Sequence, residues 1–237
     1  MPGIFLSAEW RHLAMLNYEV DPAILQSRVP PGTELDLWNG KAIVSIVGFM
    51  FLKTRVLGIP IPFHMNFPEL NLRFYIKRPH ATGNRRAVAF VKEVVPRFAI
   101  AFVARTLYNE NYVALPMRNS LEINPTGVTA AYEWKLNGRW QKLSVHCSGD
   151  CAIPLKESGA EFITEHYWGY AAQAGGGTME YQVTHPQWRT WEADDYTFDA
   201  DVESLYGPEF APFLKGKPIS AILAEGSPIT VSKGLKF

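Results

Sequence analysis

Residues 67–75 read FPELNLRFY and alternate between apolar and polar side chains along most of their length. Successive side chains of an extended strand point to opposite faces, so this stretch predicts a strand with two chemically different faces. The apolar face carries Leu70, Leu72 and Phe74, and the polar face carries Glu69, Asn71, Arg73 and Tyr75. The polar row is either a solvated face of a sheet or the wall of an internal cavity.

Two features of this strand favour the cavity. Asn71 belongs to a residue type that is depleted in strands, and the opposite face is entirely large and apolar. In a closed sheet with helices packed outside, such a pattern places the polar row in the lumen. Neighbours on the row lie about 7 Å apart, so Glu69 can approach Asn71, whereas Arg73 lies about 13 Å from Glu69.

The strand leads into a predicted hairpin over residues 73–95, since Gly83-Asn84 is a turn signal between two strand-like runs. A second hairpin is predicted over residues 127–147, where Asn137-Gly138 favours a type I′ turn. Runs rich in β-branched and aromatic residues indicate further strands at 42–51, 178–193 and 218–232.

Helix signals are fewer and shorter. Asp21 and Pro22 suit the N-cap and first position of a short helix in residues 21–32. Ser158 and Glu161 form a capping box ahead of a predicted helix over residues 161–172. Two more helices are expected, over residues 97–112 after Pro96 and near residues 202–214.

Strands thus outnumber helices, and the hairpins imply antiparallel pairing. The sequence predicts the α+β class, with a large, curved antiparallel sheet of a kind that can close into a barrel. No internal repeat or long linker divides the 237 residues, so residues 1–237 are expected to form a single domain.

Composition excludes several classes of function. The 23 basic and 23 acidic residues balance, and no basic run could follow a phosphate backbone, so no nucleic-acid partner is expected. Two cysteines cannot build a disulfide scaffold. The first residues lack the features of a signal peptide, and the most apolar windows are too short to span a bilayer, so a cytoplasmic protein without membrane contact is expected.

The predicted helix after Pro96 carries a polar stripe. Helical spacing places Arg105, Tyr108 and Tyr112 on one face of a largely apolar segment. Burying an unpaired arginine would cost several kcal/mol, so Arg105 needs a partner. That partner is either an internal carboxylate, Glu69 or Glu93, or the carboxylate of a ligand, which the planar guanidinium can bind bidentately.

Other reactive side chains give weaker signals. Lys92 and Glu93 are adjacent in a strand, so only one of them can point inward; an inward Lys92 could form a Schiff base, whereas an outward one is simply solvated. His146, Cys147 and Cys151 resemble metal ligands, but no second pair completes a tetrahedral site. The chain has no glycine-rich phosphate or dinucleotide motif, and no cofactor is expected.

Three segments carry a family resemblance: residues 10–36 (WRHLAMLNYEVDPAILQSRVPPGTELD), the strand 67–75, and residues 90–117 (FVKEVVPRFAIAFVARTLYNENYVALPM). Together they resemble the bacterial YqjF-like proteins, a domain-of-unknown-function family distantly related to acetoacetate decarboxylase. The resemblance covers most of the chain. It implies a cone-shaped antiparallel β-barrel with outer helices and a ligand site inside.

The resemblance also bears on single residues. Arg11 precedes Asp21 by the spacing at which the decarboxylase carries an active-site arginine. If Arg105 is matched to a second arginine of that enzyme, Tyr112 or Val113 stands where its Schiff-base lysine should be. Glu69 is a loose match to one of its active-site glutamates. The resemblance therefore implies the pocket more strongly than the imine chemistry.

The favoured hypothesis is an internal pocket that binds, with or without transforming, a small organic acid or carbonyl compound. Glu69, Arg105 and Tyr108 are its candidate catalytic residues, and its candidate substrate-binding residues are Arg11, Asn71, Arg73, Tyr112 and Glu93. One alternative is a lysine-dependent decarboxylase or lyase that uses Lys92. The other is a non-catalytic interaction module that forms a homo-oligomer through its aromatic late segments.

Overall fold

A computed structural model describes residues 3–81, 83–97 and 111–237 of the chain. Most of these residues lie in two β-sheets, one of twelve strands and one of four. The described helices are short, namely the 3-10 turns η1 (Pro22–Ile24) and η2 (Gln26–Arg28) and the α-helices α2 (Gly159–Thr164), α3 (Val202–Tyr206) and α4 (Ala211–Leu214). None of the helices in these ranges has the length and apolar character that crossing a membrane requires.

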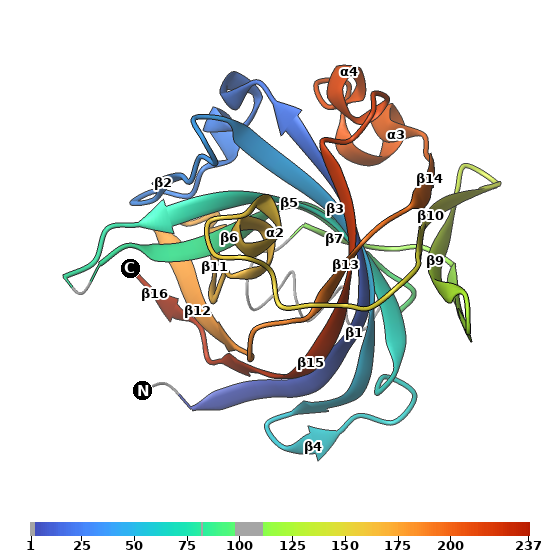
Figure 1. Ribbon diagram of the computed structural model, residues 1–237. Helices are drawn as coiled ribbons and strands as arrows, with labels where there is room; N and C mark the ends of the chain where they lie inside the picture. Colours follow the sequence, from blue (N-terminus) through green and yellow to red (C-terminus); the bar gives the residue numbers. More distant parts are fainter. Residues whose placement is uncertain (1–2, 82, 98–110) are drawn as a thin grey trace.

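Seven strands of the large sheet pair in a closed ring, in the order β15, β1, β3, β5, β6, β11, β12 and back to β15. Their bounds are β1 (Ile4–Val20), β3 (Ala42–Val56), β5 (Phe67–Arg78), β6 (Arg85–Val95), β11 (Trp168–Ala172), β12 (Thr178–Thr184) and β15 (Ser220–Ser232). The β12–β15 pairing, Val183 with Val231 and Thr184 with Thr230, closes the ring. Figure 1 looks into this ring, with α2 drawn across its opening.

Short strands extend the ring at its edges, and the second sheet lies beside it (Figure 1). The edge strands are β2 (Glu34–Leu35), β4 (Ile59–Pro60), β7 (Tyr112–Ala114), β13 (Thr190–Glu192) and β16 (Leu235–Lys236). The second sheet has the order β14, β10, β9, β8, with bounds β8 (Met117–Asn124), β9 (Gly127–Leu136), β10 (Arg139–Cys147) and β14 (Asp195–Asp199).

The two faces of β5 lie in different environments. Leu70, Leu72 and Phe74 point outward into an apolar core shared with the second sheet and with α3 and α4. The inward residues belong to a separate set of contacts that includes Phe67 and Tyr75. Because the large apolar side chains are buried in the outer core, the polar side chains, which point to the opposite face of the strand, lie on the inside of the ring.

Both predicted hairpins are confirmed. Residues 73–95 contain the β5–β6 pair, and residues 127–147 contain the β9–β10 pair. At the second turn Asn137 has φ 52° and Gly138 has φ 81°, as a type I′ turn requires at both central residues. The turn chemistry of Asn137-Gly138 therefore accounts for the tight connection of the second hairpin.

The helix predictions were only partly correct. Ser158 does cap α2, because its Oγ accepts a hydrogen bond from the Glu161 amide at 3.2 Å, but the helix ends at Thr164 rather than at residue 172. Residues 168–172 instead form β11, where tertiary pairing with β6 and β12 overrides the helical pattern. The segment 21–32 forms two 3-10 turns, and most of the helix predicted over 97–112 lies outside the described residues.

A glycine in β3 allows the second sheet to approach the ring. A Cβ at Gly48 would lie 2.6 Å from the Tyr132 ring, and the Tyr132 hydroxyl donates a hydrogen bond to the His12 carbonyl at 2.7 Å. Gly48→Ala is therefore expected to lower the free energy of unfolding by about 1–3 kcal/mol through overpacking. Denaturant unfolding measures this effect, and Gly175→Ala, whose Cβ meets only the end of Lys236 at 4.0 Å, is the control. Equal stability of the two variants would contradict the packing role of Gly48.

Candidate functional site

A cavity of ≈ 270 Å³ lies on the inner side of the ring. Every strand of the ring contributes to its wall: Trp10 from β1, Phe49 from β3, Glu69 from β5, Phe90 from β6, Trp168 from β11, Tyr181 from β12 and Val231 from β15. Most of the wall is aromatic or aliphatic, with a few polar side chains among these residues. This combination is typical of sites for small organic ligands.

The polar row of β5 lies in this wall. Glu69 and Asn71 are 2% and 3% exposed, and the Asn71 Nδ2 donates to Glu69 Oε1 at 3.1 Å. Tyr112, from β7, donates its hydroxyl proton to Glu69 Oε2, also at 3.1 Å. Glu93 is 2% exposed, faces the cavity and pairs across the strands with Asn71. Of the two interpretations of the row, the structure supports the wall of a cavity.

The environment of Glu69 sets its acidity. Burial raises the pKa of Glu69 to about 7, and the hydrogen bonds from Asn71 and Tyr112 oppose this rise by favouring the ionised form. A carboxyl group with a pKa near neutrality can both release and accept a proton at physiological pH. Glu69 is thus equipped for general acid–base chemistry.

Arg73 is the cation of the cavity. Its side chain lines the cavity although the residue is only 9% exposed. Its Nη2 donates to the Ile163 carbonyl of α2 at 3.1 Å and to the Met15 Sδ at 3.9 Å, and its guanidinium lies 5.6 Å from the centre of the Tyr75 ring. None of the ion pairs among the described residues involves Arg73. A buried cation in this state attracts an anion strongly.

Two histidines that follow α2 in the chain, His166 and His185, also line the cavity. His166 is held neutral, because burial lowers its pKa to about 4, and its Nε2 lies 3.8 Å from Asp36 Oδ2. His185 stacks between Tyr167 and Trp188, with ring centroids 4.7 and 4.1 Å away, and burial lowers its pKa as well. Sequence reasoning missed both, since isolated histidines far apart in a chain give no spacing signal.

Several buried polar atoms on the cavity wall have no hydrogen-bond partner among the described residues. They are Trp10 Nε1, Thr54 Oγ1, Asn71 Oδ1, Arg73 Nε and the two ring nitrogens of His166. An unsatisfied buried donor or acceptor costs about 1–3 kcal/mol, and native proteins contain few of them. Their concentration around one cavity indicates that its contents, water or a ligand, provide the missing partners.

The structure therefore gathers five of the eight predicted site residues, namely Glu69, Asn71, Arg73, Glu93 and Tyr112. Arg105 and Tyr108 lie outside the described residues. Arg11, the remaining prediction, lies elsewhere.

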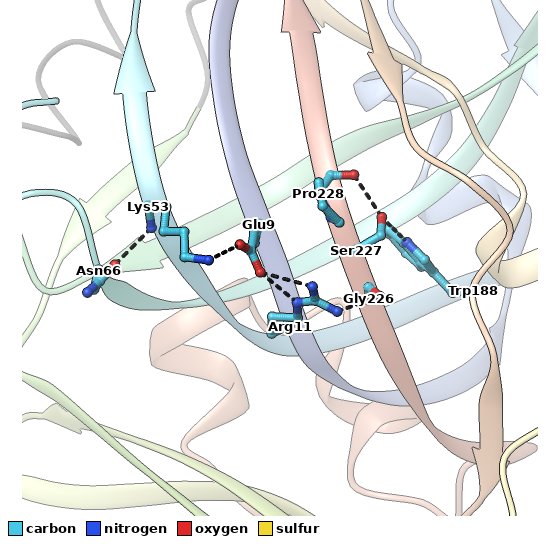
Figure 2. Close-up of polar contacts among 8 residues, drawn as sticks. All are labelled: Glu9, Arg11, Lys53, Asn66, Trp188, Gly226, Ser227 and Pro228. Carbon is cyan, nitrogen blue, oxygen red and sulfur yellow. Dashed lines mark hydrogen bonds and ion pairs between the residues drawn. The ribbon is translucent and has the colours of Figure 1, made fainter. Parts of the chain in front are cut away.

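Arg11 lies on β1 beside Glu9 and Gly226, as Figure 2 shows. Its guanidinium contacts Glu9 at 2.9 Å and the Gly226 carbonyl at 3.2 Å, and Lys53 contacts the same glutamate at 2.6 Å. Trp10, the neighbour of Arg11, lines the cavity, so strand alternation directs Arg11 away from it. The arginine predicted to hold a ligand anion is instead part of a surface ion-pair group.

Lys92 also lies on the outer side. It pairs across the strands with Leu72, whose side chain belongs to the outer core, whereas Glu93 faces inward. Burial lowers the pKa of Lys92, with a further contribution from Arg28, but neither effect brings the amine to the cavity. All eleven lysines of the chain lie in the described ranges, and none lines the cavity.

The suspected metal ligands do not converge. Cys147 and Cys151 are buried, unpaired cysteines, and His146 Nδ1 lies 2.9 Å from the Thr129 hydroxyl. Within the described part of the chain, no group of three or more histidine, cysteine or acidic side chains could hold a metal ion.

The closed order of strands belongs to a mostly β protein with the fold of the acetoacetate decarboxylases. Acetoacetate decarboxylase from Legionella pneumophila superposes with a TM-score of 0.65 at 13% identity, over 100% of this chain and 88% of that one. MppR, an enduracididine biosynthesis enzyme solved in complex with pyruvate, gives 0.68 at 13% identity, over 100% of this chain and 91% of that one. An acetoacetate decarboxylase-like enzyme from Sphingomonas wittichii superposes with a TM-score of 0.65 at 12% identity, over 98% of this chain and 92% of that one. Such low identities establish the shared fold and nothing about activity.

Within that fold the chain belongs to the DUF2071 family of uncharacterized conserved proteins, whose model matches residues 7–228. It is also similar to the uncharacterized protein YqjF of Bacillus subtilis, with 40% identity over 76 residues. That match spans 31% of this chain and 31% of YqjF.

Proposed function

We propose that this protein binds a small organic acid or carbonyl compound in the cavity inside its ring of strands. The observation that carries the proposal is Arg73, a buried cation on the cavity wall that forms no ion pair with a described carboxylate. A ligand carboxylate would neutralise it and accept hydrogen bonds from its guanidinium. The neutral His166 offers a ring N–H donor to a carbonyl oxygen in the same space, and Asn71 Oδ1 offers an acceptor to a hydroxyl group of the ligand.

The same site supports proton transfer. The pKa of Glu69 lies near neutrality, and its two carboxylate oxygens accept hydrogen bonds from Asn71 and Tyr112. It would give or take a proton at a carbon or oxygen of the bound compound. The pyruvate complex of MppR shows that a protein of this fold can hold a small keto acid, which is consistent with the proposal. The ring of pairings, with a cavity on its inner side, likewise supports one domain built as a cone-shaped barrel.

Ligand-dependent stabilisation tests the proposal. A panel of acetate, pyruvate and acetoacetate is compared with the neutral analogue acetamide by thermal unfolding at pH 6.5. At a concentration about 100 times its Kd, a bound carboxylate stabilises the folded state by about 2.7 kcal/mol, which raises Tm, whereas acetamide leaves it unchanged. If no carboxylate shifts Tm more than acetamide does, the proposal fails.

Schiff-base chemistry is not expected, because no lysine lines the cavity. Treating the protein with pyruvate and borohydride should therefore leave its mass unchanged, and Lys92 in particular should carry no adduct. Intact-mass spectrometry with peptide mapping measures this. A stoichiometric adduct on Lys92 would contradict this expectation and support the alternative hypothesis of a lysine-dependent decarboxylase.

A further inference from the structure

The cavity is polar at one end and apolar at the other. Inward residues of β5 run in the order Phe67, Glu69, Asn71, Arg73, which places Phe67 about 20 Å from Arg73 along the strand. Around Arg73 the wall also contains His166 and Thr164. A ligand that reaches Arg73 with its carboxylate therefore directs the rest of its body toward the Phe67 end.

The Phe67 end is built of packed aromatic rings. Phe51 stacks on Phe67 with ring centroids 4.7 Å apart, and Trp10 meets Phe49, Phe51 and Trp188 edge-on at 5.5, 5.7 and 6.2 Å. Trp188 is fixed in turn by a hydrogen bond from its Nε1 to the Ser227 hydroxyl at 2.8 Å (Figure 2). These rings offer a rigid apolar surface and favour an apolar or aromatic ligand body.

The apolar character continues out to the surface. Between β3 and β5 the segment 57–65 exposes Leu57, Ile59, Ile61, Phe63 and Met65, with Phe63 exposed by 86%. Ile61 and His64 of this segment line the cavity, as do Thr54 and Val56 just before it. The cavity thus meets solvent beside an apolar rim, whereas the polar end lies beneath α2, whose Ile163 carbonyl binds Arg73.

We infer that the ligand is an amphipathic carboxylate, with its anionic head at Arg73 and an alkyl or aromatic body that extends from there toward the rings of Trp10, Phe51 and Phe67. This inference rests on the proposed function and narrows it from any small organic acid to acids with an apolar body. Acetate or pyruvate would fill only the polar end and leave the aromatic surface to water. Each methylene added to the body is buried against that surface.

A homologous series of ligands tests the inference. Isothermal titration calorimetry with acetate, butyrate, hexanoate, octanoate and 3-phenylpropionate is expected to show affinity rising about fourfold per added methylene, which corresponds to about 0.8 kcal/mol per buried CH2. Phenylpropionate should bind at least as well as hexanoate. If short carboxylates bind but affinity does not change with length, the inference is overturned and the proposed function stands. If no acid of the series binds, the proposed function fails as well.

A matched pair of variants places the ligand body. Ile61→Asn adds a polar group at the rim of the cavity, and Ile59→Asn makes the same change two residues away, where the side chain does not line the cavity. Hexadecanoate is long enough to extend from Arg73 to the rim, so Ile61→Asn is expected to weaken its binding about fivefold or more and to leave butyrate binding unchanged, whereas Ile59→Asn affects neither. Equal effects of the two variants on hexadecanoate binding would overturn the assignment of the body to this rim.

Discussion

Replacing Arg73 by methionine is expected to weaken carboxylate binding by about 30-fold or more. Removing one partner of a buried charge pair costs about 2–5 kcal/mol, because the other charge is left in a site that water cannot fully reach. Arg73 is the only described cavity-lining residue with a permanent positive charge, so no other described side chain on that wall can replace it. Calorimetric titration with octanoate and pyruvate measures the loss.

The same variant is expected to keep or gain stability when no ligand is bound. Arg73 is buried without an ion pair to a described carboxylate, and exchanging such a cation for an apolar side chain of similar length removes its desolvation cost. Loss of binding with retained stability separates a ligand-binding residue from a structural one.

Two further variants serve as controls for Arg73. Arg73→Lys keeps the positive charge but loses the planar guanidinium that binds a carboxylate through two hydrogen bonds. Its affinity for the acids should therefore fall between those of the wild type and Arg73→Met. Arg11→Met changes the arginine that contacts Glu9 on the outer side, and it should bind the acids as the wild type does. If Arg73→Met binds within threefold of the wild type, or Arg11→Met loses binding, the assignment of the anion site is wrong.

Replacing Glu69 by glutamine is expected to stabilise the protein at alkaline pH and to have little effect below pH 5. The pKa of Glu69 is about 7 when folded against a reference of 4.5. Between these values the folded state keeps a proton that the unfolded state has lost, so the free energy of unfolding falls as pH rises. This decrease in the free energy of unfolding reaches about 3 kcal/mol above pH 7 in the wild type and is absent in Glu69→Gln.

Thermal unfolding at pH 5 and pH 9 measures this difference. For a chain of this size, about 3 kcal/mol corresponds to a Tm gain of roughly 6–12 °C for Glu69→Gln at pH 9. Glu9→Gln is the control, since hydrogen bonds from Lys53 and Arg11 lower the pKa of Glu9 rather than raise it. A Tm difference between Glu69→Gln and the wild type that is the same at both pH values would show that Glu69 does not titrate near neutrality.

Local sequence patterns predicted the hairpins and the nature of β5. Asn137-Gly138 supplies the positive φ angles of its turn, and the period of two in residues 67–75 separates Leu70 and Leu72 from Glu69 and Asn71. The capping box at Ser158 likewise marked the start of α2. Each of these signals acts between residues that are neighbours in the chain.

Errors arose where long-range pairing decided the structure. Residues 168–172 carry a helix-compatible pattern but complete the ring as β11, and β1 (Ile4–Val20) was not anticipated as a strand. Arg11 was assigned to the pocket by resemblance, yet the strand directs it to the outer side beside Glu9. His166 joined the site only because the chain returns to β5 after about 90 residues, a contact that no local pattern encodes.

The sequence by itself determined that β5 has one apolar and one polar face, because alternation is a property of a single strand. Only the tertiary structure decided that the polar face is inside. That choice depends on β12 meeting β15 to close the ring, and on the second sheet with α3 and α4 covering Leu70, Leu72 and Phe74 on the outside. Burial then gives Glu69 its raised pKa and leaves Arg73 in need of an anion, because desolvation and charge pairing depend on all the atoms around a group.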